Sequence, residues 1–131
     1  MHAIGTFDVK LTPQQTAPET TSDPTRGRMT IEKHFHGALE AESRGEMLTG
    51  GNPAKGSAGY VAIERVSGTL DGKHGSFLLQ HSATMQGGHS SLTITVIPGS
   101  GTGELDGIAG SMTVEVSEGK HSYTFDYSLP N

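Results

Sequence analysis

Apolar and polar residues alternate with a period of two along most of the chain, which is the pattern of β-strands with one buried face. In the first run, residues 3–11, Phe7, Val9 and Leu11 alternate with Asp8 and Lys10. Because successive side chains of a strand point to opposite sides, this run predicts a strand that turns its apolar residues toward a core.

The alternation stops between residues 12 and 27. This segment holds Pro13, Pro18 and Pro24 among Gln, Thr, Ser and acidic residues, and it contains almost no large apolar side chain. Proline removes a backbone donor and the segment can bury little area, so neither a helix nor an interior strand is expected. We predict a flexible loop, which acts as a linker or as a lid over one end of the fold.

Two further strands are predicted between residues 29 and 47, with a bend or bulge at Gly37. On the first strand, the face taken as inward carries Met29, Ile31, Lys33 and Phe35, and the other face carries Thr30, Glu32, His34 and His36. On the second strand, the inward face carries Leu39, Ala41, Gly45 and Met47. Its outer face carries Glu40, Glu42, Arg44 and Glu46.

The best hairpin signal joins residues 59–70 to residues 76–85 through the turn Asp71-Gly72. Gly87-Gly88 then turns the chain into a strand at 92–96, and a glycine-rich connection at 98–110 leads to a strand at 112–116. We interpret that connection as a bent strand or tight corner, because no phosphate-binding motif or helix follows it. The last strand, 123–129, follows the turn 118–120.

The sequence therefore predicts an all-β fold of about eight strands with no amphipathic helix. Closing such a sheet into one antiparallel barrel removes its exposed edges, and the chain of 131 residues has room for a single domain. An eight-stranded barrel has an interior that side chains fill or that holds one small ligand. A two-sheet sandwich is the alternative architecture.

Charge and composition exclude several classes of partner. The formal net charge is −5, and no basic run alternates with aromatic residues, so a nucleic-acid partner is not expected. The chain has no cysteine, and no run of about 18 apolar residues or signal-peptide pattern is found. We expect a cytoplasmic protein that needs neither a membrane nor a cofactor, and we leave open whether it forms a homo-oligomer.

Several motifs occur in a fixed order along the middle of the chain: GYVAIER at 59–65, GTLDG at 68–72, GSF at 75–77, QH at 80–81 and PGSGTGEL at 98–105. In this combination the chain resembles a bacterial family, domain of unknown function 3224. The resemblance extends from residue 29 to 110 and on to 123–129. It implies a small barrel similar to that of plant allene oxide cyclase, a fold whose relatives include enzymes acting on apolar substrates. It supplies no established reaction.

Glu64 and His81 are the main candidates for chemistry. Glu64 shares a strand face with Tyr60, Ala62 and Val66, and an inward carboxyl could donate or accept a proton or could form a structural ion pair. If the other face of that strand points inward, Arg65 is the interior charge and Glu64 lies at the surface. His81 follows Phe77 and Leu79 on an apolar face, where it either packs as a core residue or exchanges protons.

The register of the predicted hairpin places Glu64 and His81 within one or two residue pairs of each other. We therefore predict that both face the interior and lie close enough to interact.

His34, His36 and Glu40 match the His-x-His-x3-Glu pattern of cupin metal sites. The two histidines share a strand face with Thr30 and Glu32, which indicates solvent, and no second cupin motif follows. A cupin-like metalloprotein is thus the last of three functional hypotheses, and we expect no bound metal.

The first functional hypothesis is a barrel that binds a small apolar or aromatic molecule. The second is an isomerase or cyclase in which Glu64 and His81 transfer a proton on an apolar substrate. The residues predicted to line the cavity are Tyr60, Phe77, Met85, Tyr123, Phe125 and Tyr127.

Overall fold

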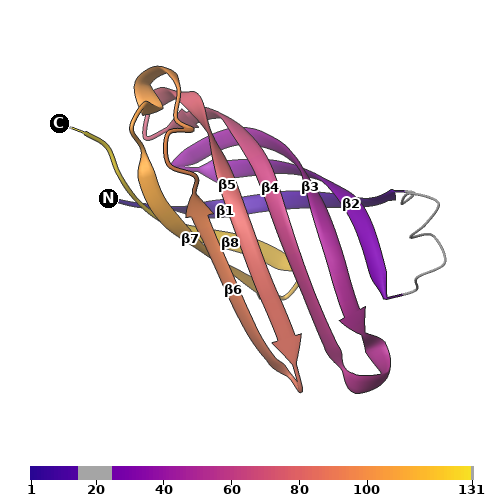
Figure 1. Ribbon diagram of the computed structural model, residues 1–131. Helices are drawn as coiled ribbons and strands as arrows, with labels where there is room; N and C mark the ends of the chain where they lie inside the picture. The colour runs from indigo at the N-terminus through magenta and orange to yellow at the C-terminus, as the bar shows by residue number, and fades with distance from the viewer. Residues whose placement is uncertain (15–24, 131) are drawn as a thin grey trace.

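The computed structural model describes residues 1–14 and 25–130, which form a closed antiparallel barrel of eight strands (Figure 1). The strands are β1 (His2–Gln14), β2 (Arg26–Gly37), β3 (Leu39–Asn52), β4 (Ser57–Leu70), β5 (Lys73–Gln86), β6 (His89–Val96), β7 (Ala109–Ser117) and β8 (Lys120–Ser128). Most of the loop predicted at 12–27 lies outside the described residues. Residues 12–14 and 26–27, however, extend β1 and β2.

Each strand pairs with its neighbours in the chain, and β1 pairs with β8 to close the barrel. Three predicted turns are tight two-residue connections with positive φ at both positions. The φ angles are 49° and 83° at Asp71-Gly72, 57° and 84° at Gly87-Gly88, and 52° and 78° at Glu118-Gly119. Such turns match the twist of antiparallel strands. Closure excludes the sandwich alternative.

The connection from β6 to β7 plugs one end of the barrel. It contains the 3₁₀ turn η2 (Gly103–Leu105), and it buries Leu105 and Ile108 against the core. The approach is close, because a Cβ on Gly75 would lie 2.1 Å from the carbonyl oxygen of Thr102. The segment predicted to form a bent strand or tight corner therefore covers one end of the barrel. The other helical segment of the described chain is η1 (Pro53–Lys55), and no described helix is long and apolar enough to cross a membrane.

The strand β4 turns its even-numbered residues inward. Ala62, Glu64 and Val66 are buried, whereas Val61 and Ile63 are 53% and 51% exposed. The face carrying Glu64 is thus the interior face, and Arg65 lies outside.

As formed by residues 1–14 and 25–130, the barrel interior is packed at one end and open at the other. The plugged end, where both termini lie, holds most of the apolar core (Figure 1). The opposite end, which we call the mouth, carries the β3–β4, β5–β6 and β7–β8 connections. There β6 and β7 pair only at Ile94↔Met112 and Thr95↔Ser111 within the described residues and then diverge. Inward-facing apolar side chains near the mouth are partly exposed, namely Leu11, Met85, Leu92 and Val116.

Candidate functional site

Three ionisable side chains meet in the middle of the barrel interior. The Nζ atom of Lys33 lies 3.0 Å from Oε2 of Glu64, and Nε2 of His81 lies 3.2 Å from the same oxygen. The side chain of Glu64 is fully buried, and those of Lys33 and His81 are 9% and 6% exposed. Glu64 and His81 therefore both face the interior and lie in contact, as predicted.

The strand register explains this meeting. Glu64 pairs with Leu79 on β5, so His81 is the next residue on the same face of that strand. Lys33 lies on β2, which is separated from β4 by β3. It pairs with Ser43 of β3. The three side chains thus come from β2, β4 and β5.

Small residues on β3 let Lys33 reach Glu64. Gly45 pairs with Glu64, and a Cβ there would lie only 2.6 Å from Cα and 2.7 Å from Cβ of Glu64. Gly45 and Ser43 are successive inward positions, so no large side chain stands between β2 and β4 at this level. The small residues Ser43 and Gly45 of β3 are therefore needed for this contact.

Burial and the two neighbouring side chains together determine the pKa of Glu64. Burial by itself raises the pKa of Glu64, but the contacts with His81 and Lys33 outweigh burial and hold that pKa below its ordinary value. The ammonium of Lys33 also lies 5.2 Å and 5.7 Å from the ring centroids of Phe7 and Phe35, within cation–π range. Glu64 is therefore an ionised counter-ion to Lys33.

The cluster retains unused hydrogen-bonding capacity. The contacts of Glu64 have ion-pair distances, but among the described residues neither of its carboxylate oxygens has a well-aligned hydrogen bond. The buried hydroxyl of Ser43 also has no hydrogen-bond partner there. A buried polar group without a hydrogen bond is costly, so a polar atom from water or a ligand would stabilise this region.

An interior cavity of about 140 Å³ lies on the mouth side of the cluster. Its apolar walls come from Phe7, Val9, Leu11, Ile31, Met47, Leu92, Ile94 and Val114. The polar side chains that line it are Lys33, Tyr60 and His81, whereas Glu64 is sealed beneath them. Burial and the charge of Glu64 raise the pKa of Tyr60, which keeps its hydroxyl protonated.

A second pocket of about 300 Å³ adjoins the cavity at the mouth, since Tyr60 and Leu92 line both. Met85 lines this outer pocket and is 52% exposed. It therefore belongs to the entrance rather than to the deep cavity.

The other aromatic residues predicted to line the cavity form the packed end instead. Phe77 and Phe125 stack with ring centroids 5.6 Å apart, and Phe125 stacks on Tyr127 at 5.5 Å. The hydroxyl of Tyr127 donates to Asp71 and that of Tyr123 accepts from the backbone N–H of Leu39 at 3.0 Å. These four side chains are therefore buried in the core, and none of them lines the cavity.

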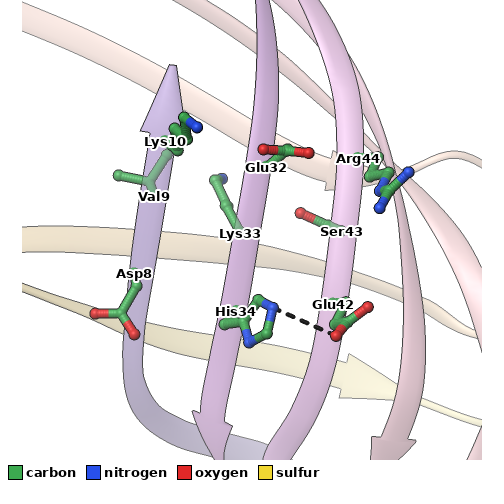
Figure 2. A pocket seen from close by; sticks show the side chains of 9 residues that line it. All are labelled: Asp8, Val9, Lys10, Glu32, Lys33, His34, Glu42, Ser43 and Arg44. Carbon is green, nitrogen blue, oxygen red and sulfur yellow. Dashed lines mark ion pairs between the residues drawn. The ribbon is translucent and has the colours of Figure 1, made fainter. Parts of the chain in front are cut away.

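The histidines of the cupin-like pattern lie on the outer surface, as their strand face indicates. Figure 2 shows His34 beside Glu42, with Nε2 3.3 Å from Oε1, in a shallow depression that also carries Asp8, Lys10, Glu32 and Arg44. His36 contacts Asp8 and Glu40 at 3.3 Å and 3.7 Å. Among the described residues, no group of three side chains is arranged to hold a metal.

Sequence reasoning identified Glu64 and His81 but did not assign a role to Lys33. The sequence feature that indicated its role was its position between Ile31 and Phe35 on the apolar face of the strand, which had to be the inward face. A buried lysine requires a carboxylate partner, and Glu64 is the one inward carboxylate of the predicted strands.

Comparisons with known proteins agree with this architecture. The family described as "protein of unknown function (DUF3224)" matches residues 3–127. A crystal structure of a protein of unknown function from that family, from Shewanella oneidensis MR-1, is 46% identical with a TM-score of 0.92. The match covers 100% of this chain and 98% of that one. No curated protein matches the chain. The similarity to allene oxide cyclase stays a prediction, but the chain belongs to the DUF3224 family.

Proposed function

We propose that the barrel binds a small apolar or aromatic molecule in its interior cavity. The observation that carries this proposal is the cavity itself, which combines apolar walls with the three polar side chains of Lys33, Tyr60 and His81. Ligand sites commonly have this composition. An apolar cavity of about 150 Å³ in another protein accommodates benzene, so about 140 Å³ suits a ring of that size. The adjoining mouth pocket gives room for a substituent or tail.

The test is ligand-induced stabilisation. A molecule that binds only the folded protein raises the free energy of unfolding in proportion to the logarithm of its concentration. Small aromatic and aliphatic compounds should raise the urea midpoint of the wild-type protein. Val114→Phe, which adds a ring inside the cavity, should abolish that response.

Val116→Phe is the matched control, because Val116 lies on the same strand face, is 64% exposed and does not line the cavity. This variant should respond like the wild type. If neither protein is stabilised by any such compound, the proposal fails. It also fails if Val114→Phe responds as strongly as Val116→Phe.

A second candidate function is proton transfer on an apolar substrate, as in an isomerase or cyclase. The contact between Glu64 and His81 favours it, since a carboxylate 3.2 Å from Nε2 favours a proton on that nitrogen, and Nδ1 of the imidazole is then the proton acceptor. The base would remove a proton from carbon, the C–H electron pair would move toward a neighbouring carbonyl oxygen, and the proton would later return to carbon.

Acetophenone in D₂O is a suitable probe for this reaction. Proton transfer would replace its methyl hydrogens with deuterium, which ¹H NMR measures as loss of the methyl signal. Wild-type protein should accelerate this exchange and His81→Gln should not. His74→Gln is the control, because His74 is an exposed residue outside the cavity. Equal exchange rates with wild type and His81→Gln would remove the catalytic candidate without affecting the binding proposal.

A further inference from the structure

We propose that the ligand is a compact, electrically neutral molecule with one hydrogen-bond acceptor, such as a ketone or aldehyde oxygen, held by Tyr60 and Lys33. This inference rests on the proposed binding function and specifies the chemical class that the cavity selects. It follows from the kinds of polar atoms that the cavity exposes and from the charge balance beneath them.

The polar wall of the cavity presents donors. Among the described residues the hydroxyl of Tyr60 has no hydrogen-bond partner, and the ammonium of Lys33 carries three N–H groups, with Oε2 of Glu64 at 3.0 Å as its ion-pair partner. The raised pKa of Tyr60 keeps its proton in place. The buried carboxylate does not reach the cavity surface, so a ligand that offers only donors would find few acceptors there.

Charge balance selects a neutral ligand. Lys33 and Glu64 already cancel each other's charge, because their Nζ and Oε2 atoms lie within ion-pair distance at 3.0 Å. A carboxylate ligand would add a buried negative charge without a free counter-ion, and a cation would add a positive one. Burying an uncompensated charge is far more costly than burying a carbonyl group that accepts two hydrogen bonds.

Four probes of the same size and branched shape separate these possibilities: cumene, acetophenone, benzoate and benzamidinium. They differ in whether the group on the ring is apolar, a neutral acceptor, an anion or a cation. Their dissociation constants are measured by NMR titration at neutral pH. We expect acetophenone to bind roughly tenfold more tightly than cumene, and both ions to bind more weakly than cumene.

Substitutions of Tyr60 and Lys33 test which side chains donate hydrogen bonds to the ligand. Tyr60→Phe removes one hydroxyl and should reduce the preference for acetophenone over cumene severalfold while leaving cumene binding unchanged. Tyr127→Phe is the matched control, because that hydroxyl donates to Asp71 at the packed end. Lys33→Met should also reduce the preference. If that variant does not fold, Tyr60→Phe still decides the result.

The outcomes distinguish the inference from the function it rests on. If cumene binds as tightly as acetophenone, or if benzoate binds most tightly, the cavity is a binding site but the assigned ligand class is wrong. A preference for acetophenone that survives Tyr60→Phe unchanged also overturns the assignment to Tyr60. If none of the four probes binds, the proposed binding function itself fails.

Discussion

Lys33 reaches past strand β3 to place its ammonium 3.0 Å from a carboxylate oxygen of Glu64, a residue whose side chain is completely buried. The consequence is a charged pair inside an apolar barrel, directly below a cavity. This pair makes the site sensitive to single substitutions, and each of the following predictions tests one part of it.

Glu64→Gln should destabilise the protein by about 3–5 kcal/mol, because it leaves the buried ammonium of Lys33 without a counter-ion. The free energy of unfolding in urea measures this change. Glu46→Gln is the control, since Glu46 pairs with Arg28 at the surface and its loss should cost less than about 1 kcal/mol. Equal effects of the two substitutions would show that the interior pair is unimportant for stability.

The double variant Lys33→Met with Glu64→Gln should recover most of the stability lost by Glu64→Gln alone. Both charges are then absent, and a buried ion pair often contributes little relative to apolar residues of similar size. The double-mutant cycle measures the coupling between the two residues. Purely additive effects would contradict a direct interaction.

The stability difference between wild type and Glu64→Gln should shrink in acid. The pKa of Glu64 is lower in the folded protein than its ordinary value of 4.5, so as pH falls the unfolded chain takes up this proton first. The stability that the ionised carboxylate contributes is therefore fully present above that ordinary value, and it is lost progressively as the pH falls from there through the lower pKa of the folded state. Urea unfolding of both proteins across this range measures the change. A constant difference would contradict the depressed pKa.

Gly45→Ala should destabilise the barrel by about 1–3 kcal/mol, because the new methyl group would overlap the carbonyl oxygen of Ile63 and the backbone of Glu64. Gly50→Ala on the same strand is the control. The nearest atom to its new Cβ is 3.8 Å away, which is an ordinary contact. Thermal unfolding of the two variants should thus separate them clearly, and similar melting temperatures would show that β3 and β4 are not closely packed at Gly45.

Two tyrosines should respond differently to loss of the hydroxyl. Tyr123→Phe leaves the buried N–H of Leu39 without its partner and should cost about 1–3 kcal/mol. Tyr60→Phe should change the free energy of unfolding little, because no described residue bonds to that hydroxyl. If Tyr60→Phe is as destabilising as Tyr123→Phe, the hydroxyl of Tyr60 is structural and not free for a ligand.

The sequence predicted the eight-stranded barrel because period-two alternation and turn pairs such as Asp71-Gly72 act locally, within a strand or a hairpin. The same hairpin register predicted the contact of Glu64 with His81. The pairing of Lys33 with Glu64 depends on the relative register of β2 and β4 across a third strand, which no local pattern specifies.

The sequence did not predict which inward residues lie at the packed end and which lie at the mouth. Phe77 and Met85 occupy inward positions of one strand, yet one is fully buried and the other half exposed. Alternation tells which face a residue occupies, but the depth along the barrel depends on strand stagger and on the end plug formed by Leu105 and Ile108.

The most direct test of the central claim is an isotope-filtered NMR experiment that detects nuclear Overhauser effects between bound acetophenone and the methyl groups of the protein. The account predicts contacts to Ile31, Ile94 and Val114, which surround the cavity. Contacts instead to Leu48, Val61 and Ile63, which form an exposed apolar strip on the outside of β3 and β4, would contradict it.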